Sequence, residues 1–201
     1  MKSNIPIVLL ASGSSSRMRG KDKLLEKING TTLIRNRVLE CMKATSGSIY
    51  VTLPPKNEER FSAVSDLPII PVITEGPHLG ISHSIKVSLS QIDNSEVIIL
   101  LADLVEITSE DLTKIIEAYE VNKCSITRGV DDDGKVGHPV LIRRAIIDEF
   151  LTLSKDQGGK SILEKNSANT NFVTLPSKNA TWDLDTPEDW ASWRTIKAKS
   201  G

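Results

Sequence analysis

The stretch IPIVLLASGSSSRMRGKDKLL, residues 5–25, joins an apolar run to a loop of small residues and cations. The apolar residues 7–11 are typical of a strand that is buried on both faces of a sheet. The small residues 11–16 let backbone N–H groups approach an anion closely. Positive charge then comes from four side chains, Arg17, Arg19, Lys21 and Lys23. We therefore expect an α/β protein with a phosphate-binding loop at the end of its first strand.

The alternation of strand and helix continues along the chain. Further apolar runs of strand length cover residues 48–53, 68–73, 96–102 and 124–130. Between the runs, apolar residues recur at helical spacing in 31–44, 57–64, 80–92 and 109–121. This order predicts a mostly parallel sheet with helices on both faces.

The rhythm changes after residue 130. The sequence predicts a turn at 131–137, a short strand at 138–142, a helix at 143–153 and a final strand at 171–175. Neither a linker nor an internal repeat divides the chain, so we expect residues 1–201 to form a single domain. In such sheets, ligands bind at the carboxyl ends of the strands, and the loop at 11–16 has that position.

Composition limits the classes of partner. The chain has 201 residues, 25% of them charged, and a net charge of -1, which gives no general electrostatic reason to bind nucleic acid or an anionic membrane. No apolar run approaches the ~20 residues that span a bilayer. The apolar run near the N-terminus is too short for a signal peptide, and Cys41 and Cys124 have the character of reduced thiols. We expect a cytoplasmic protein.

The loop does not match the common glycine motifs. A P-loop has four residues between its first glycine and Gly-Lys-Ser/Thr, whereas Gly13 and Gly20 are separated by six residues. The dinucleotide fingerprint Gly-x-Gly-x-x-Gly is absent as well. From the residues alone, a phosphate site and a solvated cationic loop both stay open.

Two acidic elements are candidates for a metal site. Asp103 follows the apolar run 96–102 directly, where a carboxylate is well placed to bind Mg²⁺, although a turn aspartate is the alternative. Near the C-terminus, Thr186 and Asp189 have the spacing of a helix capping box. Asp183 and Asp185 add two carboxylates beyond what capping requires.

The segment LLASGSSSRMRGKDKLL resembles the signature of nucleotidyltransferases, in particular the molybdenum cofactor cytidylyltransferases and their relatives. The resemblance implies that Arg17 binds the outgoing pyrophosphate and that Lys23 contacts phosphate near the reacting centre. It also implies that the nucleotide is bound by the loop residues Ala11, Ser12, Gly13, Ser14, Ser15 and Ser16. Two departures stand out: Ser12 replaces an alanine or glycine, and Arg19 lengthens the loop by one residue.

The acidic elements carry the same resemblance. LLADLVEIT is similar to the family's Leu-x-Asp-x-Pro-x-Val/Ile-Thr element, with Val105 in place of the proline. WDLDTPEDW is similar to Asp-Ile-Asp-Thr-Pro-Glu-Asp, whose second aspartate is a metal ligand. The resemblance therefore implies that Asp103 and Asp185 hold one Mg²⁺ and, with Arg17 and Lys23, form the catalytic set.

Three further elements follow the family in order. TEGPHLGISHSIKVSL resembles the element that contacts base and ribose, which implies nucleotide-binding roles for Gly80, Ser82 and Ser84. GKVGHPVLI and SKDQGGKSIL resemble acceptor-side elements, with Lys160 in place of the usual arginine. The implied acceptor-side residues are Gly137, His138, Pro139, Asp156, Gly158 and Lys160.

The resemblance implies a three-layer α/β/α, Rossmann-like nucleotidyltransferase fold with a mostly parallel, mixed central sheet. It implies transfer of CMP from CTP to the phosphate of molybdopterin cofactor, with a molybdoenzyme apoprotein or a maturation factor as a downstream partner. Guanylyl-transferring relatives have two glycines at the positions of Ser12 and Gly13, which favours cytidine. The alternatives are another nucleotide, a sugar or alcohol phosphate as acceptor, a non-catalytic nucleotide-binding protein, and an NAD-dependent oxidoreductase, which the missing fingerprint disfavours.

Overall fold

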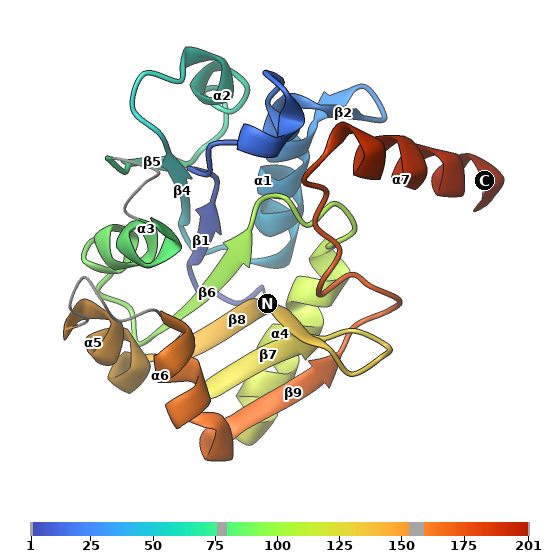
Figure 1. Ribbon diagram of the computed structural model, residues 1–201. Coiled ribbons are helices and arrows are strands. Elements are labelled where there is room, and N and C mark those ends of the chain that lie inside the picture. Colours follow the sequence, from blue (N-terminus) through green and yellow to red (C-terminus); the bar gives the residue numbers. More distant parts are fainter. Residues whose placement is uncertain (1, 76–79, 153–158, 201) are drawn as a thin grey trace.

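The computed structural model describes residues 2–75, 80–152 and 159–200, and its centre is a seven-stranded sheet (Figure 1). The strand order is β5-β4-β1-β6-β8-β7-β9. The strands β5, β4, β1 and β6 run parallel to one another, β8 is antiparallel to both β6 and β7, and β7 and β9 are parallel. The strand bounds are Ile7–Leu10 (β1), Ile49–Leu53 (β4), Ile70–Ile73 (β5), Glu96–Leu101 (β6), Ile126–Val130 (β7), Val136–Arg143 (β8) and Thr170–Thr174 (β9). The predicted mixed, mostly parallel sheet is confirmed.

Helices cover both faces of the sheet, as the sequence predicts (Figure 1). One apolar core includes Leu9 of β1 with α1 (Leu33–Ala44) and α4 (Ser109–Asn122). The other core includes Val8 with α3, α5 and α6, which span Gly80–Leu89, Arg144–Thr152 and Gly159–Lys165. Consecutive residues of β1 thus face opposite cores, and the whole strand is buried.

Four details differ from the expected elements. Strand β8 extends two residues before and one residue after the predicted 138–142. Helix α6 was not expected, and neither was the hairpin of β2 (Lys27–Ile28) and β3 (Thr31–Thr32). The helix expected at 57–64 is the shorter α2, Glu58–Ser62. Short 3-10 turns complete the described elements at Ser16–Met18, Lys23–Leu25 and Ser167–Asn169.

The last helix, α7 (Pro187–Ser200), begins at the predicted capping box. The Asp189 amide donates to Thr186 Oγ1 at 3.1 Å, and Asp189 Oδ2 accepts from the Thr186 amide at 2.9 Å. The buried rings of Trp190 and Trp193 join the core on the α1 and α4 side. This anchoring fixes the segment just before α7, which carries Asp183 and Asp185. Of the helices in residues 2–75, 80–152 and 159–200, none is long and apolar enough to cross a bilayer.

Candidate active site

The loop after β1 is folded around two buried apolar side chains. Met18 and Leu24 are buried and join the core, which holds the backbone on either side of Gly20 against the sheet. Ser15 has a φ of 51° and Gly20 a φ of 87°, so the chain turns sharply at both positions. The amides of Gly13 and Ser14 donate no hydrogen bond to any group in the described part of the chain. Exposed, unpaired amides in a small-residue loop suit an anion.

Arg60 of α2 holds this loop in place through side-chain hydrogen bonds. Its side chain is only 2% exposed, and its Nη1 donates to the Ala11 carbonyl at 2.6 Å. Its Nε and Nη2 bind the two carboxylate oxygens of Asp22 at 2.6 and 2.8 Å, and Nη2 also donates to Ser15 Oγ at 3.1 Å. Burial opposes ionisation of Asp22, but the hydrogen bond and charge of Arg60 outweigh it and lower the pKa of Asp22. The result is a loop whose two ends are tied to one guanidinium.

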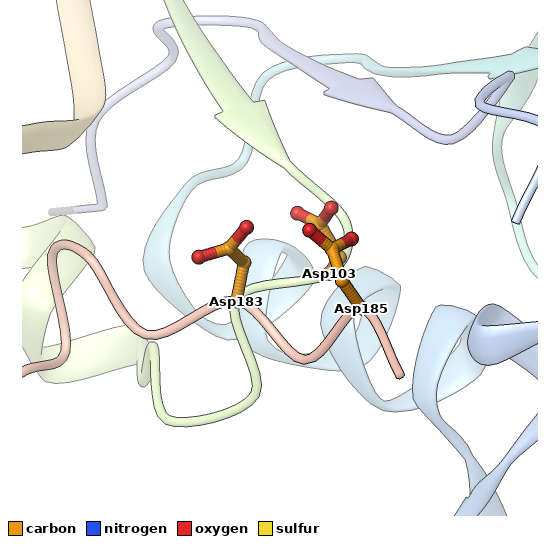
Figure 2. Close-up of side chains that lie close together, drawn as sticks. All are labelled: Asp103, Asp183 and Asp185. Carbon is orange, nitrogen blue, oxygen red and sulfur yellow. The ribbon is translucent and has the colours of Figure 1, made fainter. Parts of the chain in front are cut away.

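Three carboxylates meet beside the loop (Figure 2). Asp103 lies just beyond β6, whereas Asp183 and Asp185 lie on the segment before α7. Each offers an oxygen, and these oxygens all lie within 4.8 Å of one another. An isolated bridge between Leu104 and Asp183 holds the two segments together. The sequence places Asp103 and Asp185 far apart, and the fold brings them to one point.

Lys23 joins two of these carboxylates. Its ammonium donates to Asp103 Oδ2 and to Asp185 Oδ1, at 2.6 Å each, and its side chain is 12% exposed. Burial disfavours the charged ammonium, but Asp103 and Asp185 outweigh burial and raise the pKa of Lys23. Arg17 adds an exposed ion pair to Asp185 at 2.7 Å, which contributes little stability by itself because water screens it.

The residues of this cluster fit a divalent cation. Asp103 Oδ1 is buried and has no hydrogen-bond partner among the described residues. Desolvation raises the pKa of Asp183, and the negative charges of Asp103 and Asp185 raise it further. Carboxylate oxygens are the ligands that Mg²⁺ and similar hard cations prefer. A cation here would be held by Asp103, Asp183 and Asp185.

Two cavities flank the loop. One, of about 150 Å³, has polar lining from Ser12, Lys23, Ser84 and Asp103 and apolar lining from Leu101. The Oγ atoms of Ser12 and Ser84 lie 2.9 Å apart, so the loop contacts α3 directly. The other cavity, of about 290 Å³, follows the loop and has Ser12, Gly13, Ser14, Ser15, Ser16 and Arg60 in its wall. Together they form a continuous site along the ends of β1 and β6.

A third cavity, of about 500 Å³, lies over β6, β8 and β7 and beneath α3, α5 and α6. Its wall is mainly apolar, with Ile85, Ile99 and Phe150 among the lining side chains. Ile81 lines both this cavity and the smaller cavity beside Lys23, so the two adjoin along α3.

The remaining predicted binding residues are divided between the cavity beside Lys23 and the third cavity. Gly80 and Ser84 line the cavity beside Lys23, whereas Ser82 lines the third cavity and accepts a hydrogen bond from the Gly159 amide at 3.0 Å. His138 and Lys160 line the third cavity as well.

Of the other four predicted acceptor-side residues, Gly137 and Pro139 line none of these three cavities. Pro139 is buried in β8, and Gly137 of the same strand lies against the segment before α7. A Cβ at Gly137 would lie 2.0 Å from the Ala180 carbonyl oxygen, so this glycine permits close packing. Asp156 and Gly158 lie outside the described residues.

Three side chains of the site escaped the sequence analysis. Asp183 was noted only as surplus acidity, although its spacing from Asp185 was a usable signal. Arg60 has its partners far away in the sequence, and Arg128, which lines the third cavity, lies within an apolar run predicted as a strand. Neither Arg60 nor Arg128 lies in a local sequence pattern that indicates a role in the site.

A family model described as a MobA-like NTP transferase domain matches residues 7–170. The chain belongs to this family. It is therefore a nucleotidyltransferase.

Other known proteins are more distant relatives of this NTP transferase. The bifunctional protein GlmU of Francisella philomiragia is 26% identical over 152 residues, which cover 75% of this chain and 32% of that protein. GlmU of Psychrobacter cryohalolentis is 24% identical over 186 residues, covering 90% of the chain and 38% of that protein. The chain spans about a third of the length of these curated relatives.

Solved structures share the fold at low identity. Rv0371c of Mycobacterium tuberculosis superposes with a TM-score of 0.82 at 22% identity, over 96% of this chain and 97% of that one. A complex of the same protein with manganese gives a TM-score of 0.77 at 21% identity, over 94% and 97%. CMP:2-keto-3-deoxy-manno-octonic acid synthetase in complex with CTP gives 0.78 at 14% identity, over 99% and 100%.

Proposed function

We propose that this NTP transferase moves CMP from CTP to the phosphate of molybdopterin cofactor, with Mg²⁺ as its metal and pyrophosphate as the second product. The observation that carries the proposal is the meeting of Lys23, Asp103 and Asp185 beside the loop, where Lys23 and Asp103 also line the cavity of about 150 Å³. The ammonium of Lys23, the carboxylate cluster and the unpaired amides of the loop lie in one place. Together they fit a triphosphate with its metal better than they fit a neutral ligand.

In the proposed step, an oxygen of the acceptor phosphate attacks the α-phosphorus of CTP. The bond from that phosphorus to the bridging oxygen breaks, and pyrophosphate leaves with the electron pair. The acceptor phosphate is already ionised, so no general base is required. The protein contributes in-line positioning and charge neutralisation.

The residues divide this work between them. The amides of Gly13 and Ser14 would bind the β- and γ-phosphates, and Arg17 would balance charge on the departing pyrophosphate. Lys23 would leave its carboxylate partners to contact the α-phosphate. Mg²⁺, when bound by Asp103 and Asp185 with Asp183, supplies further neutralisation of the phosphate charge.

Support for cytidine comes from the sequence and from one neighbour. Ser12 stands where guanylyl-transferring relatives carry a glycine, and its hydroxyl touches Ser84 in the small cavity. The structural neighbour in complex with CTP shows that this fold accommodates that nucleotide in another protein.

Pyrophosphate release tests the proposal. The purified protein is incubated with Mg²⁺, molybdopterin cofactor and each of CTP, GTP, ATP and UTP in turn. The proposal expects release with CTP and cofactor together, and none with either alone. Turnover of GTP would assign guanylyl transfer, and turnover of a sugar or alcohol phosphate without cofactor would reject the acceptor. Nucleotide binding without turnover of any acceptor would favour a binding protein.

A further inference from the structure

Arg128 projects from β7 into the wall of the apolar 500 Å³ cavity. Its Nη2 donates to the Gly137 carbonyl at 3.3 Å, and its Nε is buried without a partner among the described residues. It forms no ion pair with a carboxylate of residues 2–75, 80–152 or 159–200. A guanidinium has five N–H donors, so most of the donors of Arg128 remain available.

The rest of the wall does not neutralise this charge. The polar lining groups include Glu164, but its side chain is 65% exposed and is paired with Lys160 at 3.5 Å. The charges of Arg128 and Asp103 act on His138 with opposite effects on its pKa. Its Nδ1 faces the Ile99 carbonyl at 3.2 Å and donates in the neutral ring. Burial, with a smaller effect from Arg128, lowers the pKa of His138 to about 4, so the ring is neutral at pH 7.

A partly buried arginine in an apolar wall is costly unless an anion meets it. Burial lowers the pKa of Arg128, which records the same cost. Guanidinium groups bind phosphate and carboxylate through two parallel N–H···O bonds. The cavity therefore offers an apolar volume that ends in a receptor for an anion.

The register of the sheet gives the distance between this receptor and the reacting centre. Val140 of β8 pairs with both Ile99 of β6 and Arg128 of β7, so Arg128 lies level with Ile99. Strand β6 continues from Ile99 to its end at Leu101, and Asp103 lies in the turn just beyond. Two strand spacings sideways and two residues along put the Cα atoms of Arg128 and Leu101 roughly 12 Å apart. The arginine side chain covers part of that distance, and a ring system can fill the rest.

We propose that Arg128 binds a second anionic group of the acceptor, at the end of an apolar ring body opposite the phosphate that receives the nucleotide. The acceptor class is thus a ring compound with two charged ends. This inference rests on the nucleotidyl transfer of the proposed function, because it takes the large cavity as the acceptor site of the transferase. It does not depend on molybdopterin as the acceptor, since the pterin ring has no anionic group opposite its phosphate. Arg128 is a specificity residue here and takes no part in the chemical step.

The test uses three small probes on the full chain with Mg²⁺ and a CTP analogue whose α–β bridge is a methylene group. Phenyl phosphate has one anion, whereas 4-carboxyphenyl phosphate and 1,4-phenylene bisphosphate have an anion at each end of the ring. Calorimetry compares their dissociation constants for the wild type, Arg128→Met and Arg128→Lys. Arg143→Met is the matched control, because Arg143 is exposed at the far end of β8.

For the wild type we expect one or both double-ended probes to bind about tenfold more tightly than phenyl phosphate, in line with one charge-assisted pair. Arg128→Met should abolish that gain without weakening phenyl phosphate, Arg128→Lys should retain part of it, and Arg143→Met should retain all of it. Which double-ended probe gains more identifies carboxylate or phosphate as the second anion.

Three results would overturn the inference: no gain in the wild type, a gain that survives Arg128→Met, or equal weakening of all probes by that variant. The last result would mean that Arg128 only supports the sheet. Failure of the proposed function is seen separately, as absence of binding of the CTP analogue to the wild type before any probe is added.

Discussion

Asp103 and Asp185 accept hydrogen bonds from one ammonium, that of Lys23, at 2.6 Å each, although they are 82 positions apart in the sequence. The fold thus assembles this cluster from the first loop, the end of β6 and the entry to α7. The ammonium offsets the repulsion between the carboxylates and lines the cavity of about 150 Å³.

Replacing Lys23 with methionine should lower the rate of pyrophosphate release on the order of 10²-fold, because a preorganised positive charge is lost where negative charge develops. Steady-state kinetics with CTP and acceptor measure the effect. Lys27→Met, which changes an exposed lysine of the β2–β3 hairpin, is the control and should behave as the wild type. A Lys23→Met enzyme with wild-type turnover would remove this lysine from the mechanism.

The carboxylate cluster predicts how metal affinity responds to single substitutions. Asp103→Asn and Asp185→Asn should each weaken Mn²⁺ binding on the order of tenfold or more, because affinity follows the number of charged oxygen ligands. Asp183→Asn should also weaken it if all three carboxylates act as ligands. Electron paramagnetic resonance of free Mn²⁺ gives the dissociation constants, and Asp93→Asn provides an exposed control. Unchanged affinity in Asp183→Asn alone would reduce the site to two carboxylates.

The sequence was informative where local pattern and structure coincide. The buried strands β1 and β6 are apolar runs, and the capping box at Thr186 and Asp189 appears as predicted. Asp103 was predicted as a site residue because it directly follows a strand, and parallel sheets bind ligands at the carboxyl ends of their strands. The Asn29-Gly30 pair, typical of a tight hairpin turn, is the local signal for the β2–β3 hairpin.

The features that the sequence did not predict depend on contacts between segments that are far apart in the chain. Arg60 reads locally as a charged residue of a short amphipathic helix, and only its long-range bonds to Ala11 and Asp22 show that it is buried. Arg128 looks like an outward-facing strand residue until α3, α5 and α6 cover that face. Helix α6 is short and begins at Gly159, a poor helix former, so its stability comes from packing against α5 and Phe150.

Arg60→Met should both disturb the loop and lower the stability of the protein. Removing one partner of a mostly buried pair costs about 3 kcal/mol of unfolding free energy, because Asp22 is left without its guanidinium. We also expect a raised KM for CTP, since the loop loses its bonds to Ala11 and Ser15. Urea unfolding and kinetics measure the two effects, with Arg60→Lys expected to recover part of each.

The exposed pair of Arg35 and Asp66 supplies the comparison for Arg60. The Asp66 side chain is 62% exposed, so Arg35→Met should cost less than about 1 kcal/mol and leave the KM for CTP unchanged. Equal losses of stability in the two variants would contradict a special role for the buried arginine. If Arg60→Met loses stability while its KM for CTP is unchanged, Arg60 stabilises the fold and has no role in CTP binding.

His138 should make the protein less stable in mild acid. Burial, with a contribution from Arg128, lowers its pKa from 6.5 to about 4, so between these values the unfolded chain binds a proton that the folded protein does not. Stability is complete above pH 6.5 and is lost as the pH falls toward 4, at about 1.4 kcal/mol per pH unit and roughly 3 kcal/mol in all. Urea midpoints from pH 7.5 down to pH 4.5 measure the slope. His138→Gln, which keeps a donor for the Ile99 carbonyl, should remove this part of the slope, whereas His83→Gln serves as the matched substitution outside the cavity. An acid slope that persists unchanged in His138→Gln would mean that other groups cause it.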